Sequence, residues 1–251
     1  ERIARASKAA LNNLISLAIE EQCKFVVLAG DIFDGDIRNF QSALHFAKQM
    51  RRLKEANIAV FIALGNHDAE NKFMARLDLG DNVHLFASRK PETIRFDDVA
   101  VALHGQSFPK RDVTDNIARD YPAPLPGYFN IGVLHTACTG RAEHHAPYAP
   151  CSLEQLVNHG YGYWALGHVH KHQVLSSDPW VVYPGNLQGR SAKETGPKGA
   201  MLVEVNDGVV RSAEHRTLDA VRWEILDVDV TGAADLQGVS AALRMVLDAA
   251  T

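Results

Sequence analysis

The alternation of hydrophobic and polar positions predicts two helix–strand pairs at the start of the chain. Apolar residues recur at helical spacing over residues 2–22 and again over 40–56. Each helical segment is followed by a short apolar run without polar alternation, at 25–29 and at 58–64. Such runs are typical of strands that are covered on both faces. The order strand, helix, strand therefore predicts a βαβ unit with two parallel strands.

Beyond residue 80, short strand-like runs dominate the pattern. They occur at 83–86, 93–96, 99–103, 131–134, 163–166, 180–183, 200–205 and 209–216. Between them we expect helices at 112–120 and 152–159, and a loop over the proline-rich segment 121–128. The fold class is thus predicted to be α/β.

A domain boundary is predicted near residues 218–219. After it we expect a strand over 221–230 and an amphipathic helix over 234–249. A strand and a helix in this position are typical of the start of another small domain. We therefore predict one domain over 1–218 and the beginning of a smaller, capping-like domain over 219–251.

Composition and charge narrow the class of protein. Hydrophobic residues make up 46% of the 251 positions and charged residues 22%, which is ordinary for a globular protein and excludes a disordered or collagen-like chain. The formal net charge of −4 argues against binding nucleic acid through bulk positive charge. Two divalent cations would bring that sum to zero, so anion binding depends on whether the chain holds metal ions.

The three cysteines, Cys23, Cys138 and Cys151, are widely spaced and form no C-x-x-C pair. This pattern indicates neither a disulfide framework nor a cysteine-type zinc site, and it favours reduced thiols in the cytoplasm. No apolar run approaches the roughly 20 residues that a transmembrane helix needs. We therefore expect a cytoplasmic protein without a membrane partner.

Four of the strand-like runs end in residues that can bind metal. These are Asp31, with Asp34 three positions further on, then Asn66, His67 and Asp68, then His135, and finally His168 and His170. In α/β sheets, ligands bind outside the carboxyl ends of the strands. The four ends therefore predict one converging polar site. His168 and His170 are two positions apart, so in extended chain both point the same way.

Carboxylate, amide and imidazole ligands without thiolate favour Mn²⁺, with Fe or Zn²⁺ as alternatives. A carboxylate such as Asp31 has two oxygens and can bridge two ions. Two ions about 3.5–4 Å apart suit in-line attack on phosphorus by a metal-bound hydroxide. Each element alone also has a simpler reading: Asp31 as a solvated turn residue, Asn66 and Asp68 as helix caps, His135 as a core histidine. Their joint occurrence after four strand-like runs favours the metal site.

The blocks G-D-I-F-D at 30–34, G-N-H-D at 65–68, His135 and G-H-V-H at 167–170 resemble the calcineurin-like metallophosphoesterases. They match four of that superfamily's five motif blocks, and the resemblance spans most of residues 23–205. It implies a two-sheet sandwich with four layers, α/β/β/α. A narrower similarity, to the SbcD/YhaO branch of DNA-repair exonucleases, lies in three further segments: 104–108, 183–190 and 194–199.

The resemblance implies a role for each motif residue. Asp31 would bridge two metal ions. The second ion would be completed by Asn66, His135 and His168, and the first would be bound by His170. His67 would stabilise the phosphorane or protonate the leaving oxygen, oriented by Asp68. The family's opening Asp-x-His block and its strand do not precede the helix at 2–22, so we expect the first metal site to be weak or empty in this chain.

Four further residues are candidate substrate contacts. Asp34 occupies a position where some relatives carry a histidine that assists the substrate. Arg190, Lys193 and Lys198 lie in a glycine-rich segment and are predicted to contact DNA phosphates. A solvated loop is the alternative for these three.

The function predicted is that of a metal-dependent phosphodiesterase that trims DNA ends, a DNA-repair exonuclease. The resemblance also implies an SMC-like ATPase of the SbcC type as partner, and a homodimer. Two alternatives stay open. One is another calcineurin-like phosphoesterase, acting on a nucleotide, a lipid or a phosphoprotein. The other is a catalytically silent scaffold for the ATPase.

Overall fold

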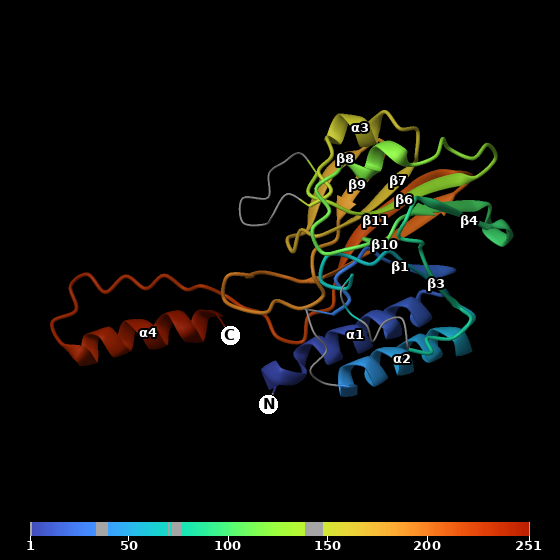
Figure 1. Cartoon of the computed structure of the whole chain (residues 1–251). Helices are drawn as coiled ribbons and strands as arrows, with labels where there is room; N and C mark the ends of the chain where they lie inside the picture. Colours follow the sequence, from blue (N-terminus) through green and yellow to red (C-terminus); the bar gives the residue numbers. More distant parts are fainter. Residues whose placement is uncertain (1, 34–39, 70, 72–76, 139–147, 251) are drawn as a thin grey trace.

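The structure is a computed structural model of the chain, and it describes residues 2–33, 40–69, 71, 77–138 and 148–250. Two helices, α1 (Arg2–Glu20) and α2 (Phe40–Glu55), lie side by side against a small parallel sheet (Figure 1). The order of its strands is β1-β2-β3, namely β1 (Phe25–Leu28), β2 (Ala59–Ile62) and β3 (Val83–Leu85). The predicted parallel βαβ unit is therefore confirmed.

A second sheet of six strands has the order β4-β5-β6-β7-β9-β8. Its strands are β4 (Glu92–Phe96), β5 (Val101–Gly105), β6 (Phe129–His135), β7 (Tyr163–Gly167), β8 (Gln173–Ser177) and β9 (Trp180–Tyr183). Strands β5, β6, β7 and β9 run parallel, and β4 and β8 pair antiparallel at the edges. A hairpin follows, made of β10 (Gly199–Asn206) and β11 (Val209–Thr217).

Successive side chains of the strands alternate between neighbouring cores, as the pleat requires. In β2, Val60 packs toward the helices, while Phe61 packs toward the six-stranded sheet. In β7, Tyr163 joins that same middle core, while Trp164 packs on the opposite side, against the layer that contains α3 (Leu153–Val157). Apolar side chains of β10 and β11, such as Val203, also pack on the middle core. Three cores between four layers confirm the predicted α/β/β/α sandwich.

Two predicted elements are absent from the described structure. Over 112–120 the chain forms only one 3-10 turn, Ile117–Asp120, because short polar and β-branched residues precede it and the Val113 carbonyl accepts from the Ala149 N–H instead. Over 221–230 no strand forms, since the segment is largely exposed and pairs with no neighbouring strand among the described residues. The loop at 121–128 is confirmed.

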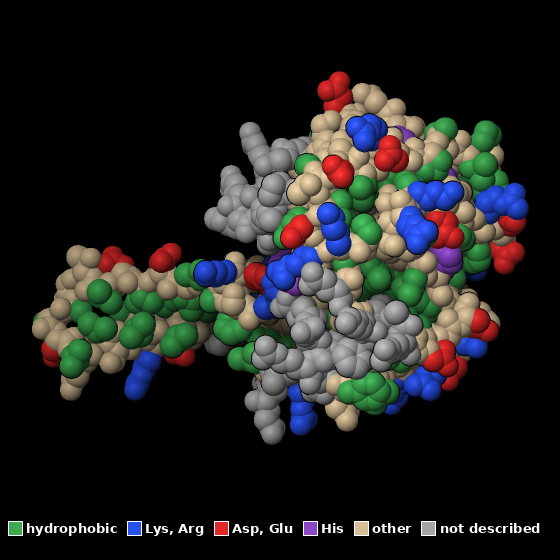
Figure 2. All heavy atoms as spheres, viewed as in Figure 1, with side chains coloured by type: hydrophobic (Ala, Val, Ile, Leu, Met, Phe, Trp, Pro, Cys, Tyr) green, Lys and Arg blue, Asp and Glu red, His purple; other side chains and the backbone are tan. Residues whose placement is uncertain are grey.

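The C-terminal helix α4 (Leu236–Ala250) is confirmed at nearly its predicted bounds. It follows an extended segment and lies away from the layered body (Figure 1). None of its residues is buried, and hydrophobic side chains such as Leu236 and Met245 are exposed along it (Figure 2). The division of the chain at 218–219 stays a prediction. Within the described residues, no helix has both the length and the hydropathy needed to cross a bilayer.

Candidate metal centre

Asp31 lies in a left-handed turn just beyond the end of β1. The φ angle is 95° at Gly30 and 51° at Asp31, a conformation that a non-glycine residue seldom adopts without a functional or packing reason. One carboxylate oxygen, Oδ1, accepts a hydrogen bond from the His67 backbone N–H at 3.0 Å. The other, Oδ2, lies 3.4 Å from Nε2 of His135. Asp31 is thus placed between the loop after β2 and the end of β6.

Asp68 joins the turns that follow β1 and β2. Its buried carboxylate accepts hydrogen bonds from the backbone N–H groups of Ile32, Phe33 and Gly65 at 3.0, 3.0 and 3.1 Å. Burial raises the pKa of Asp68 to about 6; the three hydrogen bonds oppose the rise, and the nearby Asp31 charge adds to it. These contacts make Asp68 a residue that positions Asp31. Its predicted role of orienting the His67 ring stays a prediction.

His135 is fully buried at the end of β6, and its two ring nitrogens have different tasks. Nδ1 lies 2.9 Å from the carbonyl oxygen of Ala29, so it must be the nitrogen that donates. Nε2 then carries the lone pair, and it lies 2.9 Å from Oδ1 of Asn66 and close to Asp31. Burial lowers the pKa of His135, which keeps the ring neutral. The His135 Nε2 lone pair, the Asn66 amide oxygen and the Asp31 carboxylate thus face one another, and together they fit a shared cation.

His168 completes this group of donors. It follows β7 with φ 99°, is buried, and its ring centroid lies 5.2 Å from that of His135. The ligand atoms of Asp31, His135 and His168 lie within 4.8 Å of one another, a separation that could hold a metal ion. With Asn66 beside them, four predicted ligands of one ion come together. Two oxygens and two imidazole nitrogens, without thiolate, suit Mn²⁺, Fe or Zn²⁺.

His170 is held by a residue that sequence reasoning missed. Its Nδ1 lies 2.7 Å from Oε1 of Glu194, whose other oxygen accepts from the Asn186 side chain and the Arg190 backbone N–H at 2.9 and 2.8 Å. Burial alone would raise the pKa of Glu194, but these hydrogen bonds together lower it to about 2. An ionised Glu194 accepts from Nδ1–H, so Nε2 is the nitrogen of His170 that carries the lone pair a metal ion needs. The sequence feature that could have indicated Glu194 is its position in segment 194–199, one of the three segments similar to the SbcD/YhaO branch.

His67 and His170 lie at the edge of the group formed by Asp31, His135 and His168. Both are near enough that their charges contribute to lowering the pKa of His135. Neither belongs to the three-residue group itself. His67 is half-buried, as a residue that meets both the metal group and a substrate must be.

Three motif glycines let the strand ends close around His135. A Cβ atom at Gly30 would collide with the His135 ring, and one at Gly65 would collide with the Asp31 carboxylate. A Cβ atom at Gly167 would collide with the Ala29 carbonyl. The glycine that opens each motif block is therefore required by close approach of β1, β2 and β7.

The predicted substrate contacts divide into different environments. Arg190 and Lys193 are exposed, as a phosphate contact requires. Lys198 is only 7% exposed, and its Nζ donates to the His170 carbonyl at 3.5 Å. Burial lowers the pKa of Lys198, and its packing behind His170 corrects the prediction of a loop residue that reaches DNA. Asp34 lies outside the described residues.

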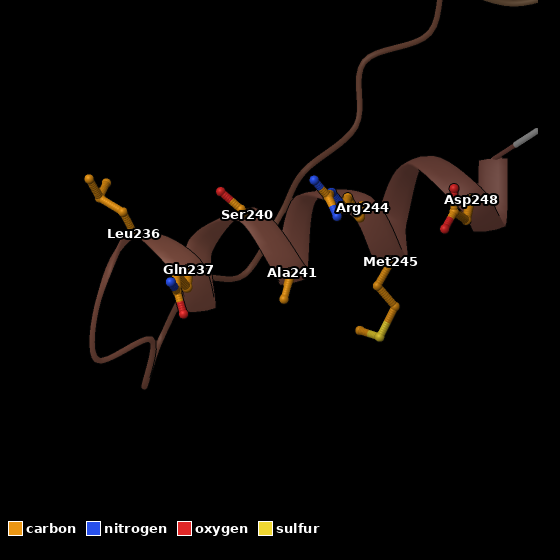
Figure 3. A pocket seen from close by; sticks show the side chains of 7 residues that line it. All are labelled: Leu236, Gln237, Ser240, Ala241, Arg244, Met245 and Asp248. Atoms are coloured by element: carbon orange, nitrogen blue, oxygen red, sulfur yellow. The ribbon is translucent and has the colours of Figure 1, made fainter.

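A hollow on α4 offers no second site of this kind. It is lined by one side of that helix alone, including Gln237, Arg244 and Asp248 (Figure 3). Because no other element among the described residues faces these side chains, they do not converge as the residues at the ends of β1, β2, β6 and β7 do.

Comparison with known proteins agrees with this geometry. Residues 5–172 match the profile of the calcineurin-like phosphoesterases, and the chain belongs to this family. It is 39% identical over 251 residues to the uncharacterized metallophosphoesterase YhaO of Bacillus subtilis, a match that covers 98% of this chain and 60% of that protein. It is 25% identical over 238 residues to the DNA double-strand break repair protein Mre11 of Thermoplasma acidophilum, covering 86% of this chain and 60% of that protein.

The chain thus spans about 60% of the length of these two relatives. Among solved structures, TT1561 of Thermus thermophilus is similar over 71% of this chain and 84% of that one, with 16% identity and a TM-score of 0.42.

Proposed function

We propose that this chain contains the nuclease domain of a metal-dependent exonuclease that cuts phosphodiester bonds at DNA ends. One observation carries the proposal: Asp31, Asn66, His135 and His168 meet at the carboxyl ends of four strands, in a family of phosphoesterases. DNA is favoured as substrate because a relative that matches 86% of the chain is named as a DNA double-strand break repair protein.

The residues present fit two divalent ions, with Mn²⁺ as the first choice. Asp31, Asn66, His135 and His168 would hold one ion, and His170 would contribute to the other. Bound there, the ions would supply positive charge at the phosphate and lower the pKa of a water molecule.

The chain's own residues perform the remaining tasks. Asp68 holds the turn of Asp31 through three backbone hydrogen bonds, and Glu194 sets which nitrogen of His170 carries the lone pair. The His67 ring, on a backbone fixed by its N–H bond to Asp31, donates a proton to the leaving oxygen. The exposed guanidinium of Arg190 binds a DNA phosphate beside His170.

Three further points belong to the same proposal. The protein works with an SMC-like ATPase of the SbcC type, which brings it to DNA ends. It acts as a homodimer. It resides in the cytoplasm, a reducing compartment, which agrees with the absence of a disulfide between its cysteines in the structure.

The decisive experiment measures degradation of linear duplex and single-stranded DNA by the full-length gene product with Mn²⁺ and with EDTA. We expect Mn²⁺-dependent degradation that falls by about 10²–10⁴-fold in His67→Ala and is unchanged in His84→Ala. His84 is a matched control because it pairs with Glu92, at 3.2 Å, and not with the metal group. Cleavage of small phosphomonoesters with intact DNA would favour the other phosphoesterases. If the Mn²⁺-loaded protein hydrolyses neither DNA nor small phosphomonoesters, the alternative of a catalytically silent scaffold is favoured.

A further inference from the structure

Two of the three cysteines form a buried pair close to the metal centre. Cys138 and Cys151 are each 6% exposed, and an isolated parallel bridge pairs their backbones outside the named strands. Their thiols are hydrogen-bonded to each other. Cys23 is half-buried just beyond the end of α1, and it provides an internal comparison.

Hydrogen bonds on both sides hold the paired segments together. The Ala137 N–H donates to the Tyr148 carbonyl at 2.8 Å, and the Thr136 hydroxyl donates to the Ala149 carbonyl at 2.6 Å. Thr136 Oγ1 also lies 3.3 Å from the Cys151 sulfur. Residues paired across a bridge have Cα atoms about 5 Å apart, within the range that a disulfide spans. The backbone would need little rearrangement to form the bond.

The two thiols are not equivalent. The hydrogen bond from Cys138 lowers the pKa of the Cys151 thiol, although burial acts in the opposite direction. The Thr136 hydroxyl donates its one proton to the Ala149 carbonyl, so toward Cys151 its oxygen can only accept. The thiolate is the reactive form of cysteine. Cys151 is therefore the attacking sulfur, and Cys138 is placed to resolve the product.

We propose that Cys138 and Cys151 are a reversible oxidation site, which hydrogen peroxide converts into an intramolecular disulfide. The Cys151 thiolate attacks one peroxide oxygen, so an S–O bond forms and the O–O bond breaks. The departing hydroxide takes up the proton that Cys151 had released and becomes water. The Cys138 thiol then attacks the Cys151 sulfur, an S–S bond forms, and the second oxygen leaves as water. Two thiols lose two electrons, and one peroxide becomes two waters.

The position of the pair links this reaction to the metal centre. Thr136 directly follows His135, and the Tyr148 ring centroid lies 5.7 Å from that of His168. Ala149, between Tyr148 and the pair, has φ 42°, a left-handed conformation that is costly for alanine. A disulfide would fix covalently the two segments that adjoin His135 and His168. This inference stands whether or not the proposed DNA substrate is correct.

The test uses the chain with Cys23→Ser, in which only the two paired thiols remain. We expect hydrogen peroxide to reduce the thiol titre under denaturing conditions from two to none and the mass by about 2 Da. Peptide mapping should join Cys138 to Cys151. The melting temperature should rise by about 5–10 °C, because the cross-link closes the loop between residues 138 and 151 and so restricts the unfolded chain. A phosphine reductant should reverse every change.

The matched control is Cys138→Ser with Cys23 retained, which also has two thiols. We expect no cross-link in it, and a sulfenic acid on Cys151 that dimedone traps. The proposal is overturned if both thiols of Cys23→Ser survive peroxide, if they oxidise only to sulfinic acids, or if the control forms the same internal cross-link through Cys23. If Cys138→Ser does not fold, peptide mapping of oxidised Cys23→Ser decides alone.

Discussion

Burial of the Asp68 carboxylate leads to a prediction about pH: the wild-type fold should lose stability, relative to an uncharged variant, as this carboxylate ionises. Asp68 is 1% exposed, and burial moves its pKa from the ordinary 3.8 to about 6 in spite of three backbone hydrogen bonds. A displacement of this size corresponds to about 3 kcal/mol, as an order of magnitude. Asparagine has nearly the shape of the protonated acid and no charge, but its side-chain nitrogen cannot accept, so Asp68→Asn also loses at least one of the three backbone hydrogen bonds at every pH.

The pH dependence follows from the direction of this displacement. The folded-state pKa lies above the unfolded value, so between about pH 4 and 6 the folded state binds the proton more tightly. The wild-type free energy of unfolding therefore falls, relative to that of Asp68→Asn, as the pH rises through this window. Between pH 4 and 7.5, the difference in the free energy of unfolding between the two proteins should shift in favour of the variant by about 2–3 kcal/mol.

The assay is urea denaturation followed by tryptophan fluorescence, in EDTA, at several values between pH 4 and 7.5. EDTA is needed because a cation on Asp31 would favour the ionised form of Asp68. Calorimetry with Mn²⁺ at pH 7.5 gives the functional cost, which we expect as about tenfold weaker binding, since the turn of Asp31 loses part of its support. A difference in the free energy of unfolding between the two proteins that stays constant from pH 4 to 7.5 would refute the reasoning, because ionisation of Asp68 would then cost the folded state nothing.

Two further predictions concern other supports of the metal centre. Glu194→Gln keeps an acceptor for Nδ1–H of His170 but loses the charge, so Mn²⁺ affinity should fall by about tenfold. Glu194→Ala also loses the acceptor, and the affinity should fall by up to about 100-fold. Calorimetry measures both affinities, and a Glu194→Gln affinity equal to that of wild type would contradict a role of the charge. Gly167→Ala places a Cβ atom against the Ala29 carbonyl and should lower the free energy of unfolding by about 1–3 kcal/mol, or more. Denaturation measures this loss, with Gly238→Ala as a control that, like Gly167, has no positive φ but whose added Cβ would come no nearer than 3.3 Å to another atom. Equal losses would contradict the role of close approach at Gly167.

The candidate site was predictable because its residues follow the strongest patterns in the chain. Asp31, Asn66, His135 and His168 each come directly after an apolar run, and parallel strands bring such ends together. Glu194 was missed because its importance depends on His170, 24 residues away, and on a loop path that no periodicity encodes.

The fold was harder to predict where packing decides the outcome. Strand β8 was missed because it lies at a sheet edge and its exposed side chains give no apolar run. The segment 221–230 has a strand-like pattern but no neighbouring strand to pair with among the described residues, and alternation alone cannot supply hydrogen-bonding partners. Lys198 lies in a glycine-rich segment that suggested exposure, and only the tertiary packing buries it.

The bond network of Asp68 also limits how such an enzyme can evolve. Because one carboxylate ties together the turns after β1 and β2, neither turn can gain or lose a residue without withdrawing Asp31 or Asn66 from the ion. New substrate preferences should therefore arise in exposed side chains along the rim, such as those of Arg190 and Lys193, since the Arg190 backbone is itself bonded to Glu194. Family members should therefore keep the residues of the metal centre almost unchanged, while the exposed side chains beside it differ from one protein to the next.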